Sequence, residues 1–151
     1  MKRILLSGLI AATLAACSKD KFETKPQIKI NEFGPSEVVK GQLIQLRATV
    51  TDKEGDIQDS LYVVRKRYNV TSGVLLNNDT IRYSLKTLGA PTKTETEIQV
   101  SFLYGELQPN VAPIENLVPV DRGYTLGLVI IDKAGNRSEY VESDKIILKK
   151  L

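Results

Sequence analysis

The chain has 151 residues, of which 42% are hydrophobic and 26% are charged, values typical of one globular domain with a short additional segment. Lys and Arg number 21 against 18 Asp and Glu, and the resulting net charge of +3 argues against a nucleic-acid partner. The sequence contains no histidine, which excludes a Ser-His-Asp triad, a Cys-His dyad and histidine-ligated zinc or iron.

The first residues predict a lipoprotein signal peptide. A positive start, Met1-Lys2-Arg3, precedes an apolar stretch over residues 4–13, which is too short to span a bilayer. Leu14-Ala15-Ala16-Cys17 then matches the bacterial lipobox, in which the Cys thiol takes the lipid and the chain is cut before it. We therefore expect residues 1–16 to be removed and Cys17 to carry diacylglycerol and a fatty acyl chain such as palmitate. An ordinary cleaved signal peptide with a chance cysteine is the alternative.

A polar segment follows the lipobox. Residues 17–27 contain one proline and show no periodicity, and we expect them to form a flexible tether from lipidated Cys17 to a domain over residues 28–151. Ser18 is not the aspartate that retains lipoproteins in the inner membrane. We therefore expect the protein to lie in the cell envelope, anchored to the outer membrane. Both its periplasmic face and its surface face remain alternatives for the anchor.

After Gln27, apolar side chains recur at every second residue, which is the period of a strand with one buried face. The clearest runs cover residues 28–30, 43–51, 97–104, 124–131 and 146–148, with weaker runs over 61–67 and 80–85. Turn signals separate the runs, and no helical periodicity is found beyond the signal peptide. The pattern predicts an all-β fold, an immunoglobulin-like antiparallel β-sandwich of about seven strands, with residues 105–121 as a long connection.

Two predicted loops are rich in oxygen ligands. One covers residues 52–59 and the other residues 132–136, and in an immunoglobulin-like sandwich these loops share one end. Asp52, Glu54, Asp56 and Asp132 could therefore converge, and a cluster of carboxylates suits Ca²⁺. Plain turns, in which Asp and Gly are favoured, are the alternative, and no other cofactor is indicated.

Both loop motifs support a resemblance. Residues 51–57 (TDKEGDI) and 132–138 (DKAGNRS) are similar to motifs of small uncharacterised Bacteroidota lipoproteins with immunoglobulin-like or fibronectin-like domains. This resemblance implies the fold and the envelope location but no activity. Asp59-Ser60-Leu61 and Asp79-Thr80-Ile81 also resemble the short O-glycosylation signal of that phylum, which implies acceptors at Ser60 and Thr80. Chance matches to a three-residue motif are the alternative.

The remaining chemistry favours binding over catalysis. The strand with Arg65-Lys66-Arg67 between Tyr62 and Tyr68 could contact an anionic glycan or lipid head group, or be an ordinary exposed strand. No nucleophile with an adjacent base is recognisable. We therefore expect a lipid-anchored, non-catalytic interaction module with the membrane and an unknown protein or glycan as partners. A small hydrolase or glycan-processing accessory component of an envelope system is the alternative.

Overall fold

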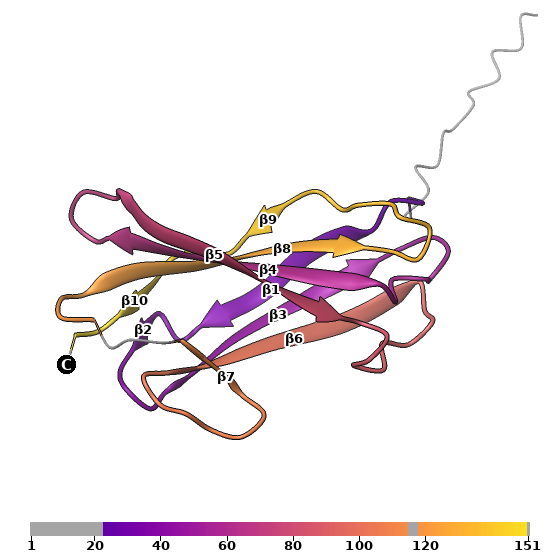
Figure 1. The fold of residues 1–151 in the computed structure, drawn as a ribbon. Helices are drawn as coiled ribbons and strands as arrows, with labels where there is room; N and C mark the ends of the chain where they lie inside the picture. Colours follow the sequence, from indigo (N-terminus) through magenta and orange to yellow (C-terminus); the bar gives the residue numbers. More distant parts are fainter. Residues whose placement is uncertain (1–22, 115–117, 151) are drawn as a thin grey trace, which may run out of the picture.

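A computed structural model describes residues 23–114 and 118–150, which form two β-sheets packed face to face (Figure 1). The four-stranded sheet has the order β1 (Gln27–Gly34), β3 (Leu43–Thr51), β6 (Glu95–Tyr104) and β7 (Ala112–Ile114). The six-stranded sheet has the order β2 (Glu37–Val38), β10 (Ile146–Leu148), β8 (Arg122–Ile131), β4 (Ser60–Asn69) and β5 (Leu75–Ser84), with β9 (Val141–Glu142) paired to β8. Over these two ranges, no helix has the length and apolarity needed to cross a membrane.

The predicted all-β, immunoglobulin-like sandwich is confirmed. The run over residues 43–51 becomes β3, in which every second side chain from Ile44 to Val50 is buried between the sheets. The same alternation places Phe102 of β6 and Leu126, Leu128 and Ile130 of β8 in the core. Strand pairs are antiparallel except for two short parallel ones, β2 with β10 and β6 with β7.

Tyr104 closes the core at the end of β6. Its ring is fully buried, its hydroxyl donates to the Lys149 carbonyl at 3.0 Å, and the Val118 N–H donates to it at 3.2 Å. One side chain thus satisfies backbone groups from two segments far apart in the sequence.

Two segments differ from the predicted pattern. The connection over 105–121 contains β7, and the chain between β8 and the predicted last run over 146–148, which becomes β10, forms a separate short strand, β9. Two serine side chains lie on either side of β9: the Ser138 hydroxyl accepts from the Ile130 N–H at 2.9 Å, and the Ser143 hydroxyl accepts from the Leu126 N–H at 3.0 Å. These hydroxyls replace part of the backbone ladder along β8, and the segment need not be a regular strand.

The last residues assigned to the tether contact the domain. The Lys53 N–H donates to the Glu23 carbonyl at 3.0 Å, Lys25 forms an ion pair with Glu139, and Pro26 is buried. The chain is therefore held to the sandwich from Glu23 onward, before β1 begins. The predicted signal peptide and the lipidation site, Cys17, lie outside the described residues.

Candidate functional site

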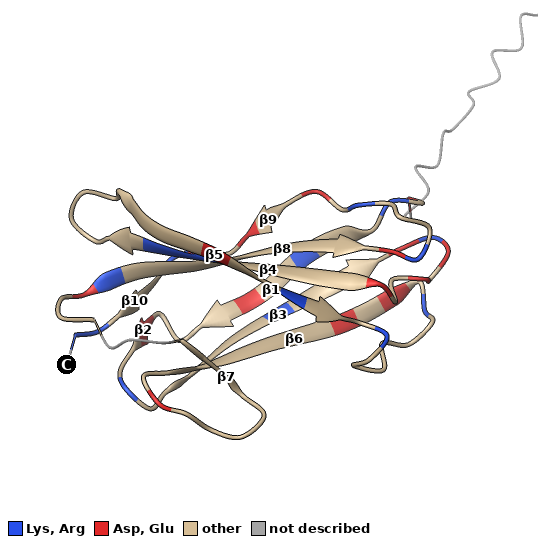
Figure 2. Ribbon diagram, viewed as in Figure 1, with Lys and Arg blue, Asp and Glu red and all other residues tan. Residues whose placement is uncertain are grey.

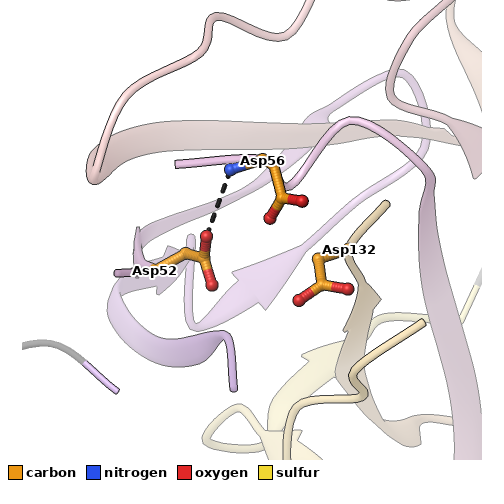
Figure 3. A group of neighbouring side chains, drawn as sticks. All are labelled: Asp52, Asp56 and Asp132. Carbon is orange, nitrogen blue, oxygen red and sulfur yellow. Dashed lines mark hydrogen bonds between the residues drawn. The ribbon is translucent and has the colours of Figure 1, made fainter. Parts of the chain in front are cut away.

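Three carboxylates meet at one end of the sandwich (Figure 3). Asp52 and Asp56 lie in the loop between β3 and β4, and Asp132 directly follows β8. One oxygen from each lies within 4.8 Å of the others, and the Lys133 N–H donates to the Asp56 carbonyl at 3.0 Å between the two loops. Of the four predicted ligands, Glu54 is exposed and stands outside this group.

Local sequence explains how each loop is held. Gly55 has φ of +67°, and a Cβ there would lie 2.9 Å from the Lys93 carbonyl carbon, so both the turn and the close packing require glycine. In the second loop, the Asn136 N–H and side-chain amide donate to the two Asp132 oxygens at 2.8 and 2.9 Å. Figure 2 shows further acidic residues at this end, where β6 begins at Glu95.

The three carboxylates are shielded from water to different degrees, and this affects their hydrogen bonding and the pKa of Asp56. Asp52 is 0% exposed and Asp132 1% exposed. The Oδ2 atom of Asp52 accepts from the Asp56 N–H at 3.1 Å, whereas the Oδ1 atoms of Asp52 and Asp56 are buried without a hydrogen-bond partner. Burial, followed by the negative charges of Asp132 and Asp52, raises the pKa of Asp56.

This arrangement suits cation binding better than catalysis. An oxygen-only donor set matches hard cations such as Ca²⁺ and Mg²⁺. A catalytic carboxylate must reach its substrate, and two of these three side chains are closed to solvent. Calcium binding itself stays a prediction.

The two predicted glycosylation acceptors differ in access. Ser60 is fully buried at the start of β4, where its hydroxyl donates to Asp59 at 2.9 Å and accepts from the Arg82 guanidinium at 2.8 Å. Thr80 lies on β5 and is exposed. The folded domain therefore offers the Thr80 hydroxyl to solvent and not the Ser60 hydroxyl.

The basic strand predicted at residues 65–67 does not present one basic surface. Arg65 binds Asp79 through two hydrogen bonds of 2.7 and 2.5 Å and lies 5.6 Å from the centre of the buried Phe102 ring. Lys66 points to the other face, where it donates to Glu142 at 2.6 Å. The alternation of a strand thus separates Arg65 from Lys66, and each of these two cations binds a carboxylate of the same chain.

Glu142 is a polar hub that the sequence did not reveal. Its carboxylate accepts from Lys66 and Thr125 at 2.6 Å, from Tyr140 at 2.9 Å and from Tyr68 at 3.0 Å. Burial alone would raise the pKa of Glu142, but these four hydrogen bonds together lower it to about 2. The hub fastens β9 onto β4 and β8.

The β4–β5 hairpin is the second feature that the predicted strands missed. β5 is the last strand of its sheet, and its apolar start, with the preceding turn, is exposed: 45% for Val70, 58% for Val74, 44% for Leu75 and 48% for Leu76. Figure 1 shows this tip at the opposite end of the sandwich from the β3–β4 loop. The run Val74-Leu75-Leu76 after Thr71-Ser72-Gly73 was the available sequence signal.

Comparisons with known proteins add similarities at the level of architecture. No family model and no curated protein matches the chain. Among solved structures, the sporulation control protein Spo0M from Bacillus subtilis shares 12% identity at a TM-score of 0.47, over 84% of this chain and 50% of that one. A family 76 glycoside hydrolase from a bovine Bacteroides thetaiotaomicron strain shares 13% identity at a TM-score of 0.36, over 84% of this chain and 20% of that one. A CARDB domain from Pyrococcus furiosus shares 15% identity at a TM-score of 0.27, over 89% of this chain and 95% of that one.

These similarities leave the function open. The chain spans half the length of the Spo0M chain and a fifth of the glycoside hydrolase. Identities this low and TM-scores below 0.5 carry no argument about ligands, partners or activity. The all-β architecture rests on the two sheets of this chain itself.

Proposed function

We propose that this protein is a lipid-anchored, non-catalytic interaction module of the cell envelope, placed on the outer membrane. In this proposal it holds a partner protein through the β4–β5 hairpin. The single observation that carries the binding role is the exposed apolar tip of that hairpin, on a strand whose outer edge pairs with no other described strand.

The lipobox supports the anchor. Cys17 is the only cysteine of the chain, and it follows Leu14-Ala15-Ala16 after a positive start and a short apolar stretch. Because the chain contacts the domain from Glu23 onward, six residues lead from Cys17 to the sandwich. Fully extended, they reach at most about 20 Å. The sandwich of a lipidated chain would then stand close to the bilayer with its carboxylate-bearing end nearest.

Composition and burial support a non-catalytic role. The absence of histidine removes the commonest general base, and the one thiol is assigned to the lipid. Glycoside hydrolysis uses two carboxylates that reach the sugar. The group of three neighbouring carboxylates found among the described residues includes Asp52 and Asp132, which are closed to solvent.

The geometry of the hairpin supports a polypeptide as the partner. Among the described residues, β5 pairs with β4 on one side and with no strand on the other. An edge strand offers backbone N–H and C=O groups to an added strand, and apolar side chains beside it favour desolvation. We therefore infer that the partner contributes an extended, apolar segment at the tip formed by residues 70–76.

The experiment compares three full-length chains in membranes of the producing cells. Leu75→Asp places a charge on the tip, and Leu88→Asp places the same charge on an exposed leucine outside the hairpin. After cross-linking and detergent extraction, we expect a discrete partner to be recovered with the wild-type chain and with Leu88→Asp. Its recovery with Leu75→Asp should fall at least tenfold at equal membrane abundance.

Two results would contradict the proposed surface. One is equal recovery of the same partner with all three chains. The other is cross-linking of the wild-type tip to glycan or lipid alone, which would assign the hairpin to a different class of ligand.

A further inference from the structure

The carboxylate cluster formed by Asp52, Asp56 and Asp132 carries a negative charge that the described protein atoms do not balance. Three carboxylates offer oxygens within 4.8 Å of one another, and none of them forms an ion pair with Lys or Arg in the described part of the chain. Like charges at this distance repel strongly where water is excluded. We propose that these three side chains bind one Ca²⁺ ion, which fastens the β3–β4 loop to the β8–β9 loop.

The strongest support is the state of Asp52. This side chain is 0% exposed, and its Oδ1 atom is buried with no donor. The Oδ1 atom of Asp56 is in the same state. A buried carboxylate oxygen without a donor loses its hydration and gains nothing in return, so such atoms are rare and favour a partner such as a cation. A cation between the loops would satisfy both oxygens at once.

Turn chemistry explains one member of the cluster but not the others. Both oxygens of Asp132 accept from Asn136, which is the ordinary role of Asp in a tight turn. In Asp52, only the Oδ2 atom accepts such a hydrogen bond, which the Asp56 N–H donates. Turn formation therefore leaves the inward-facing oxygens of Asp52 and Asp56 unexplained.

The coordination chemistry of the two common hard cations favours Ca²⁺. The three carboxylate oxygens all lie within 4.8 Å of one another, close enough to share one ion of the size of Ca²⁺, which binds oxygens at about 2.3–2.6 Å. Ca²⁺ accepts irregular geometry from protein carboxylates, whereas Mg²⁺ demands a near-ideal octahedron and gives up its waters reluctantly.

The ion would stabilise more than two loops. The Asp52 N–H donates to the Thr94 carbonyl, and the Lys53 N–H donates to the Glu23 carbonyl. The β3–β4 loop therefore also holds the segment before β6 and the segment before β1. Bound Ca²⁺ should slow amide exchange in all four segments together, because hydrogen bonds join them through the β3–β4 loop.

The test uses the full-length protein in detergent, stripped with chelator and then titrated with CaCl₂ or MgCl₂ in a calorimeter. At a Ca²⁺ concentration about one hundred times its Kd, we expect Tm to rise by about 5–10 °C. Mg²⁺ should give less than half of this rise. Asp52→Asn and Asp56→Asn should abolish it, since each removes one anionic ligand and keeps the shape of the side chain.

Glu54→Gln is the matched control, because it removes the same charge from an exposed residue of the same loop. It should keep the full Ca²⁺ response. In chelator, the Tm of Asp52→Asn should be no lower than that of wild type, because the variant has less repulsion between carboxylates. If Asp52→Asn does not fold, the same two measurements are made on Asp56→Asn, whose side chain is only half-buried. The proposed site would be overturned if Ca²⁺ left the Tm of the wild-type protein unchanged. It would also be overturned if Ca²⁺ raised the Tm of both Asn variants as much as that of wild type.

Discussion

Glu142 shows how one side chain can hold an irregular segment on a sheet. It accepts hydrogen bonds from Lys66, Tyr68, Thr125 and Tyr140, and its own side chain is 28% exposed. Removal of the carboxylate would leave the buried Thr125 hydroxyl and the Lys66 ammonium without their acceptor. Such orphaned groups cost about 1–3 kcal/mol.

We therefore expect Glu142→Ala to lower the free energy of unfolding by about 2 kcal/mol at pH 7, as measured by urea denaturation. Glu139→Ala is the control, because Glu139 lies three residues away, is exposed and, within the described ranges, forms an ion pair with Lys25 alone. It should cost less than about 0.5 kcal/mol. Equal losses in the two variants would contradict the assigned role of the hub.

The pH dependence of stability should follow from the same residue. The folded-state pKa of Glu142 is lowered from 4.5 to about 2, so its contribution is complete above pH 4.5 and is lost as the pH falls toward 2. Glu142→Ala should accordingly flatten the decline of wild-type stability between pH 4.5 and 2. If the stability of the variant declines as steeply as that of wild type over this pH range, other groups cause the loss of stability in acid.

At the scale of elements, the β3–β4 loop depends on the conformation and the position of one glycine. Gly55 and Gly73 have nearly the same φ, +67° and +69°, but only Gly55 has backbone atoms of another segment at its Cβ position. The two positions thus separate the cost of a left-handed residue from the cost of a steric clash.

We expect Gly73→Ala to cost about 1 kcal/mol, the price of the left-handed conformation alone. Gly55→Ala should cost about 2–4 kcal/mol, because the methyl group would also lie 2.9 Å from the Lys93 carbonyl carbon. Urea denaturation of both variants measures the difference. Equal costs would show that the loop can move away from the segment before β6 without loss.

Strands with one buried face could be predicted from the sequence, because burial imposes a period of two. Ile44 to Val50 in β3 is an example, whereas β8 is buried on both faces along most of its length. The loops that follow these two strands were expected at a common end. The irregular course of the chain after β8 could not be predicted, since the hydroxyls of Ser138 and Ser143 accept there from backbone N–H groups of β8. Alternation says nothing about such long-range hydrogen bonds.

The candidate site could be predicted in part, because the strands that lead to it could be predicted. Its acidic residues follow two predicted strands, so their approach could be inferred from topology. The full burial of Asp52 could not, because the segment that holds it includes Thr94, more than forty residues away. Likewise, four residues from three parts of the chain donate to Glu142, and no local sequence motif predicts this arrangement.

For the whole molecule, the proposals assign different roles to the two ends of one sandwich. The segment that leads back to Cys17 contacts the carboxylate-bearing end, and the apolar hairpin tip lies at the other (Figure 1). β4 connects the two ends with ten residues, a length of about 33 Å. An anchored domain would therefore carry its hairpin about that far beyond the end that faces the membrane.

The most direct test of this account is mass spectrometry of the N-terminal peptide of the protein, purified with detergent from the membranes of its own cells. The account predicts that residues 1–16 are absent and that the peptide begins at Cys17 with a diacylglyceryl thioether and an acylated amine. A peptide with an unmodified Cys17 thiol, or one that still carries Met1, would contradict it.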